Sequence, residues 1–175
     1  MKSSTHLVAA GYIAFASYAY LNTSPKETMI ILAASAAGSI LPDIDKKGSK
    51  VSNDNLITGL GSGIIRLFTS HRGFTHTVIG AGLISVLVTI VAGCLPIVVG
   101  NRFYYVLGWS LFTGMISHMI LDSFNPKGIM WFWPISRKRL SLLDIKTGSF
   151  TESIFRLVLI GLLVFSLVSY FIFNR

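Results

Sequence analysis

The chain has 175 residues, of which 52% are hydrophobic and 13% are charged, and its mean hydropathy is +0.66. This length fits one domain, but the composition excludes an ordinary soluble protein and indicates insertion into a membrane. The net charge of +8 would also fit a nucleic-acid-binding protein. In a membrane protein, however, basic residues mainly set the orientation, so their distribution has to be considered first.

Apolar runs separated by charged stretches predict an all-α membrane bundle of about five helices, forming one membrane-embedded domain over residues 1–175. The five runs cover residues 7–21, 29–41, 77–100, 103–121 and 154–173. The last three are close to the roughly 20 residues that a spanning helix needs, whereas the first two are shorter. Whether those two cross the bilayer completely is left open.

The first two runs have further features of their own. Residues 7–21 follow Lys2 and could be the apolar part of a signal peptide, with a loose cleavage pattern at Ser17-Tyr18-Ala19. Residues 29–41 are rich in small side chains, among them Ala33 and Ala37, which are spaced for close helix packing. Such a helix could be short and buried, and end in a pocket at Pro42-Asp43.

The basic residues predict the orientation more firmly than the number of helices. If the N-terminus is cytoplasmic, the inner side holds Lys2, five basic residues in 42–74 and five in 122–153. The outer side then holds only Lys26, Arg102 and Arg175. The excess of positive charge inside predicts a cytoplasmic N-terminus.

Two cytoplasmic segments are expected to lie against the bilayer. Residues 55–69 mix large apolar side chains with glycines, which predicts a short interfacial helix or re-entrant segment. Residues 128–134 contain Trp131, Phe132 and Trp133, an aromatic group typical of the lipid headgroup region.

The single cysteine, Cys94, lies in an apolar run, so one chain can form neither a disulfide nor a thiolate zinc cluster. A metal site would therefore need imidazole and carboxylate ligands. The histidines and several acids all fall near the predicted cytoplasmic ends of helices. They are His6, His71, His76, His118, Asp43, Asp45, Asp122 and Glu152.

Six of these eight residues fall into three short motifs. His118 and Asp122 are four residues apart on a predicted helix, so their side chains share one face. Taken alone, this spacing favours a hydrogen bond at a helix end over a metal site. Asp43 and Asp45 directly follow a helix, where Pro42 discourages its continuation, and both carboxylates can project to one side if the segment is extended. Here a solvated turn with capping aspartates is an equal alternative.

The most specific motif is Ser70-His71-Arg72-Gly73-Phe74-Thr75-His76, which stands immediately before a membrane helix. It offers two histidine ligands and an arginine that could hold an anionic group of a substrate. With the other clusters, it favours nitrogen and oxygen ligation of a divalent ion such as zinc or manganese.

At these positions the sequence resembles the YdjM-like family of membrane-bound metal-dependent hydrolases, also described as LexA-regulated inner-membrane proteins. The resemblance covers most of the chain. It rests on Thr5-His6, Leu41-Pro42-Asp43-Ile44-Asp45 with Ser49, His71-Arg72-Gly73-Phe74-Thr75-His76, Ser117-His118 with Asp122 and Gly128, and Glu152.

This family in turn looks like a distant membrane relative of the zinc phospholipase C and P1 nuclease group, which is helical and cleaves phosphate esters. The resemblance implies that His6, Asp43, Asp45, His71, His76, His118 and Asp122 are metal ligands. It also implies that Glu152 is a further ligand or a base and that Arg72 contacts phosphate. One departure is Asn125, which stands where relatives commonly have threonine.

The resemblance implies a metal-dependent hydrolase of the bacterial inner membrane, and residue chemistry permits this activity. The charge distribution puts the site on the cytoplasmic side, where a phosphoester or lipid-linked substrate is expected. Zinc is the favoured metal and manganese the alternative. A transporter is a second hypothesis, because His and Asp residues also line ion pathways, although usually near the bilayer midplane. A non-enzymatic adaptor that uses the basic loops is a third, but they contain no DNA-binding motif, so we expect no specific nucleic-acid partner.

Overall fold

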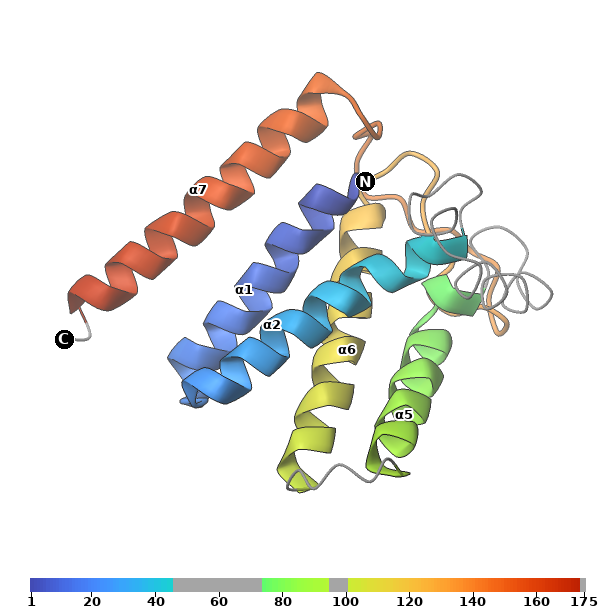
Figure 1. The fold of residues 1–175 in the computed structure, drawn as a ribbon. Coiled ribbons are helices and arrows are strands. Elements are labelled where there is room, and N and C mark those ends of the chain that lie inside the picture. The colour runs from blue at the N-terminus through green and yellow to red at the C-terminus, as the bar shows by residue number, and fades with distance from the viewer. Residues whose placement is uncertain (46–73, 95–100, 174–175) are drawn as a thin grey trace.

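The protein is all-helical in the part that the structure describes, residues 1–45, 74–94 and 101–173 of a computed structural model. Its elements are α1 (Ser3–Leu21), α2 (Pro25–Ile40), η1 (Leu41–Asp45), η2 (Phe74–His76), α5 (Val78–Cys94), α6 (Asn101–Asp122) and α7 (Phe150–Phe173) (Figure 1). No strand occurs among these residues; Ile129 and Leu140 form one isolated antiparallel bridge. Each of the five predicted apolar runs thus corresponds to a helix, while the segment 55–69 lies outside the described residues.

A sharp connection joins α1 to α2. Asn22 ends α1 with φ of 50°, in the left-handed region that asparagine tolerates better than most residues. Ser24 and Glu27 then form a capping box, in which each side chain accepts a hydrogen bond from the other residue's backbone N–H. These bonds satisfy free N–H groups at the start of α2, and the bond from the Ser24 backbone holds the pKa of Glu27 below its usual value.

The central contact of the bundle is the close crossing of α2 and α6. A Cβ atom built on Gly38 would lie 2.3 Å from the Leu111 carbonyl oxygen, and one built on Gly114 would lie 2.3 Å from that of Ser35. Only glycine lets the two backbones approach so closely. The prediction of a closely packed second helix is confirmed, but Ala33 and Ala37 are exposed and do not form the contact.

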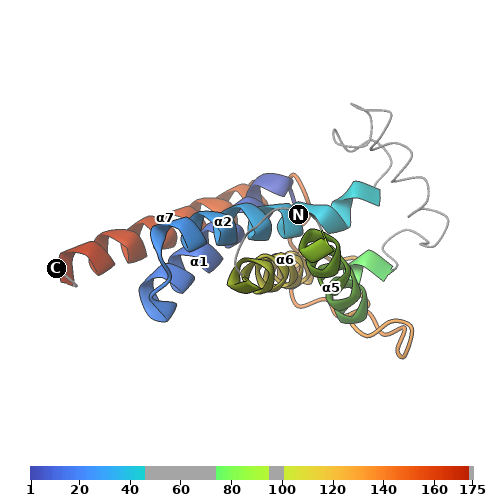
Figure 2. The same cartoon turned by 60° about the horizontal axis from the view of Figure 1, so that its bottom comes forward.

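Helix α5 lies along the other side of α6 (Figures 1 and 2). It begins directly after η2, and the junction is tight: the backbone N–H and the hydroxyl of Thr77 both donate to the Phe74 carbonyl oxygen. A Cβ on Gly80 would lie 1.9 Å from the same oxygen. The short helix that carries His76 is therefore held against the first turn of α5.

Helix α7 runs beside α1 at the edge of the molecule (Figure 2). Tyr12 donates a hydrogen bond of 2.9 Å to the Leu159 carbonyl oxygen, and Arg156 donates one of 2.6 Å to Ser4. Among the described helices, α7 alone is long and apolar enough by composition to cross a membrane, and α5 is a shorter apolar helix. The crossing of the bilayer by all five helices stays a prediction.

The segment between α6 and α7 folds back over the end of α6. Backbone N–H groups of Leu142 and Ile145 donate to the carbonyl oxygens of Ser123 and Phe124. The Trp131 indole donates to the Ser123 hydroxyl at 2.9 Å, so this tryptophan helps to hold the loop in place. Its expected position at headgroup depth stays a prediction.

Candidate metal centre

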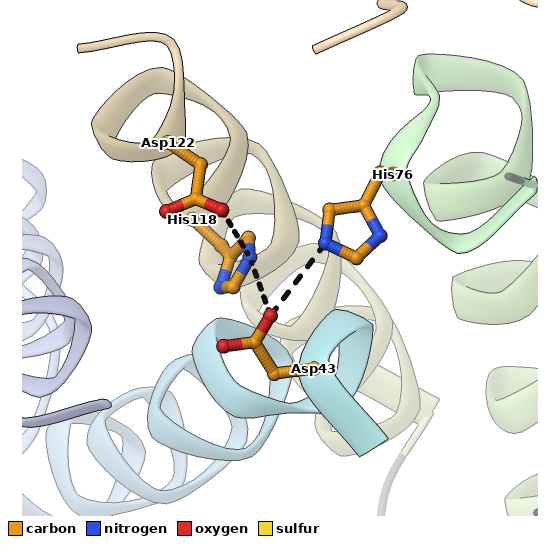
Figure 3. Close-up of side chains that lie close together, drawn as sticks. All are labelled: Asp43, His76, His118 and Asp122. Carbon is orange, nitrogen blue, oxygen red and sulfur yellow. Dashed lines mark ion pairs between the residues drawn. The ribbon is translucent and has the colours of Figure 1, made fainter. Parts of the chain in front are cut away.

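Four side chains from three separate segments converge at one end of the bundle (Figure 3). They are Asp43 from η1, His76 from η2, and His118 and Asp122 from α6. One nitrogen or oxygen of each lies within 4.8 Å of the others. His76, His118 and Asp122 are fully buried and Asp43 is 9% exposed.

Local sequence explains each position. His118 and Asp122 are one turn apart on α6, so both face the same way, as their spacing predicts. Asp43 follows Pro42 in a short 3-10 helix that continues α2 toward α6. His76 is the last residue of the 3-10 turn before α5, which brings a third segment to the same place.

The distances suit a divalent ion. Asp43 Oδ1 lies 3.6 Å from His76 Nε2 and 3.5 Å from His118 Nε2, and Asp122 Oδ2 lies 3.8 Å from His118 Nε2. Two ligand atoms that are each about 2.1 Å from one zinc ion can be at most about 4.2 Å apart, so these pairs fit with small adjustments. Two imidazoles and two carboxylates are a donor set that zinc and manganese accept.

The imidazole of His118 is oriented by the backbone of α2. Its Nδ1 lies 2.7 Å from the Ser39 carbonyl oxygen. Because a carbonyl oxygen only accepts, Nδ1 carries the proton and the neutral ring directs the lone pair of Nε2 toward Asp43 and Asp122. The Nε2 atoms of His76 and His118 are buried and have no hydrogen-bond partner among the described residues. A metal ligand held by a backbone carbonyl has this arrangement.

His6 lies against the group of four. Its ring stacks on His118 with centroids 4.0 Å apart, and its Nε2 is 3.4 Å from Asp122 Oδ1. Both ring nitrogens are buried and make no hydrogen bond to a described residue. The amino group of Met1 also contacts Asp122 Oδ1. His6 is thus in reach of the same carboxylate as His118.

Glu152 lies outside this group. Its carboxylate accepts hydrogen bonds from the backbone N–H of Lys2 and Gly148, at 2.5 and 2.6 Å, and from the Thr5 hydroxyl at 3.3 Å. These bonds join the start of α1 to the start of α7. They give Glu152 a structural role, which the sequence did not predict.

The remaining predicted residues cannot be placed at the centre. His71 and Arg72 lie outside the described residues, and so does the side chain of Asp45, whose backbone ends η1. The side chain of Asn125 donates to the Thr147 hydroxyl at 2.8 Å and accepts from the Lys127 N–H at 3.1 Å. It holds the loop after α6.

Comparison with known proteins gives the chain a family. The model of the family described as YdjM inner membrane protein matches residues 1–174. The chain belongs to the YdjM inner membrane protein family. It is also 30% identical to the uncharacterized protein YvsG of Bacillus subtilis (strain 168) over 162 residues, which are 93% of this chain and 89% of that protein. No solved structure matches the chain.

The family membership confirms the resemblance expected from the motifs. In this YdjM-family chain, sequence reasoning missed two features that position the centre, the Ser39 carbonyl oxygen and Gly114. The Ser39 carbonyl is a backbone atom, which no residue pattern identifies. The glycine at 114 could have been noticed, because it stands four residues before His118 and allows α2 to approach.

Proposed function

We propose that this protein is a membrane-bound metal-dependent hydrolase, with a cytoplasm-facing site that acts on a phosphoester or a lipid-linked substrate. The observation that carries the proposal is the buried group of Asp43, His76, His118 and Asp122 with both Nε2 atoms directed into it. A purely structural group would be expected to pair its buried imidazole nitrogens with hydrogen-bonding partners.

In this proposal, each residue of the group has a separate task. His76 and His118 supply nitrogen ligands, and the Ser39 carbonyl keeps the His118 ring in the required tautomer. Asp43 and Asp122 supply oxygen ligands, and their negative charge would attract a divalent cation. A divalent ion held by these residues would supply an activated water and a Lewis acid for a phosphoryl oxygen.

The polar environment of the group also supports a hydrolytic role. His6 borders the group beside Asp122, where it can accept or donate a proton near a reacting group. Arg72 and His71, from the motif that directly precedes η2, are the proposed phosphate contact and a further ligand. Zinc is the metal that this donor set favours, with manganese as the alternative.

His118→Ala tests the assignment. The full chain is purified in detergent, its divalent metal is measured by elemental analysis, and release of phosphate or headgroup is followed with phospholipid and isoprenyl-phosphate substrates. We expect the wild-type protein to retain metal and hydrolyse one of these substrates, and His118→Ala to lose both. Ser117→Ala is the matched control, because among the described residues its hydroxyl bonds only the Gly114 carbonyl of its own helix.

Two results would contradict the proposal. Unchanged metal content in His118→Ala would remove His118 from the ligands. Metal binding without hydrolysis, together with ion flux in proteoliposomes, would favour the transporter hypothesis instead. The position of the group at the end of α6 argues against transport, since ion sites in transporters usually lie near the bilayer midplane.

A further inference from the structure

A second feature of the molecule is a hairpin in the loop between α6 and α7, residues 129–140, which is named here the basic hairpin. Two backbone hydrogen bonds close it: the N–H of Ile129 donates to the Leu140 carbonyl oxygen at 3.0 Å, and the N–H of Leu140 donates to the Ile129 carbonyl oxygen at 2.8 Å. Within it, the Ser136 N–H donates to the Phe132 carbonyl oxygen at 2.9 Å. Figure 2 shows the loop between α6 and α7, in orange, extending beyond α5.

Apolar and basic side chains are exposed together on the basic hairpin. Phe132 is 62% exposed and Ile135 is 83% exposed. The cations of Arg137-Lys138-Arg139 follow directly in the chain, and all three residues are exposed. Residues 123–143 include no acidic residue. The surface of the basic hairpin therefore offers apolar area and positive charge, with no negative charge of its own, and exposed apolar groups of this kind mark an interaction site.

The tryptophans hold the basic hairpin against the bundle instead of adding to its exposed surface. Trp131 and Trp133 are both half-buried. The Trp131 indole donates to the Ser123 hydroxyl, and the Trp131 carbonyl oxygen accepts a hydrogen bond of 3.0 Å from the Val78 N–H. Ser123 is next to Asp122 of the metal centre, and Val78 begins α5. The basic hairpin is therefore fixed at its base to α6 and α5.

An anionic lipid surface fits both parts of this pattern. Lys and Arg side chains attract lipid phosphate groups, and apolar side chains beside them can enter the boundary of the acyl chains. A single-stranded nucleic acid would also attract the cations, but it binds by stacking on aromatic rings, and the most exposed apolar residue, Ile135, has none. Only residues 141–149 separate the basic hairpin from α7, the helix with the length and composition of a membrane span. A membrane surface is therefore within reach of the basic hairpin.

We propose that the basic hairpin docks on anionic phospholipid at the membrane surface. Arg137-Lys138-Arg139 contacts the phosphate groups, and Phe132 and Ile135 enter the edge of the acyl region. The docking site is separate from the metal centre and does not depend on hydrolysis. Because the base of the basic hairpin is bonded to Ser123, docking holds the end of α6 close to the depth of the lipid headgroups.

A fluorescent probe on the basic hairpin tests the proposal. The full chain with Cys94→Ala and Ile135→Cys is labelled on its single cysteine with a nitrobenzoxadiazole dye, which brightens in an apolar environment. It is placed in nanodiscs of phosphatidylcholine alone or of an equal mixture with phosphatidylglycerol. Quenching by brominated acyl chains reports insertion, and quenching by acrylamide reports exposure to water.

In the mixed lipid we expect a bright probe that brominated chains quench, and in neutral lipid or at high salt a dim probe that acrylamide quenches. Each cation near an anionic surface strengthens binding roughly fivefold. Replacing Arg137, Lys138 and Arg139 together by glutamine should therefore lower the ratio of docked to free probe roughly a hundredfold. Lys146→Gln is the matched control, because Lys146 is exposed on the same loop but outside the basic hairpin, and it should leave the ratio unchanged.

Equal probe signals in the two lipids would overturn the proposal, and this comparison needs no charge variant, so it holds even if the glutamine variant fails to fold. A glutamine variant that is folded by circular dichroism and docks like its parent would also overturn it. A probe that responds to added single-stranded RNA in neutral nanodiscs, but not to phosphatidylglycerol, would overturn it in favour of a nucleic-acid partner.

Discussion

Asp43 is the residue that links the histidines of two segments. Its Oδ1 atom lies within 3.6 Å of Nε2 of both His76 and His118, one from η2 and one from α6. These two segments are far apart in the sequence, so the contact depends on the turn that follows α2. A cation held between these two imidazoles would be stabilised by the charge of Asp43.

Asp43→Asn is predicted to weaken metal binding more than tenfold while leaving the fold intact. The amide keeps the shape of the carboxylate but removes its charge, and losing even an outer partner of a ligand costs about 10–100-fold in metal affinity. Metal affinity is measured by titration with a competing chelator, and helix content by circular dichroism. Asp144→Asn, on an exposed loop residue, should bind metal like the wild type.

Equal metal affinity in the wild type and Asp43→Asn would contradict a role for the charge of Asp43 and leave this side chain as a hydrogen-bond acceptor. Loss of affinity in Asp144→Asn as well would indicate a general effect of charge on this basic chain.

At this scale, residue chemistry predicted much of the centre. The spacing of His118 and Asp122 on one helix face is a local property, and the structure has it as expected. The segment of Asp43 and Asp45 is a 3-10 helix that continues α2, not the extended chain that would project both carboxylates to one side. The sequence also predicts that Glu152 belongs to the site, because it stands at a helix end as well. Its hydrogen bonds to Lys2 and Gly148 depend on where α1 and α7 meet, which no local pattern contains.

At the scale of elements, the crossing of α2 and α6 positions the metal centre. Gly38 and Gly114 let the helices touch, and this contact brings the Ser39 carbonyl to His118 and the end of α2 to Asp122. Small residues in 29–41 predicted close packing. They could not show which face packs, because alanine, serine and glycine occur all around the helix.

Gly114→Ala is predicted to lower the stability by about 1–3 kcal/mol, the usual cost of overpacking. The new methyl group would lie 2.3 Å from the Ser35 carbonyl oxygen and force the helices apart. Metal affinity should fall with it, because Ser39 and Asp43 move away from His118. Thermal unfolding in detergent, followed with and without metal, measures both effects.

Gly161→Ala is the control for this prediction, since Gly161 is also inside a helix and a Cβ there would meet nothing within 4 Å. It should be neutral or slightly stabilising, because alanine is the better helix former. Equal melting temperatures for the two variants would contradict a tight crossing.

For the whole molecule, composition predicted helices correctly but left the number of membrane crossings open. Helix α7 is apolar throughout and meets the length and composition of a spanning helix. Helix α6 is nearly as long, yet it carries His118, Asp122 and two serines, so its composition resembles that of a core helix. A buried group of His and Asp side chains lowers the hydropathy of a helix, whereas a membrane crossing requires high hydropathy, so hydropathy alone does not decide whether α6 crosses.

The excess of basic residues in 42–74 and 122–153 predicts that the N-terminus and the loop before α7 are cytoplasmic. Figure 1 shows the N-terminus and this loop at the same end of the bundle, and the turn between α1 and α2 at the other. With Cys94 replaced by alanine, Thr23→Cys should react with a membrane-impermeant maleimide in intact spheroplasts. Lys138→Cys should react only after the membrane is permeabilised, because it lies on the exposed loop of the metal-centre end. The reverse pattern would place the metal centre outside, whereas labelling of both positions in intact spheroplasts would mean that α1 and α2 do not separate two faces of the membrane.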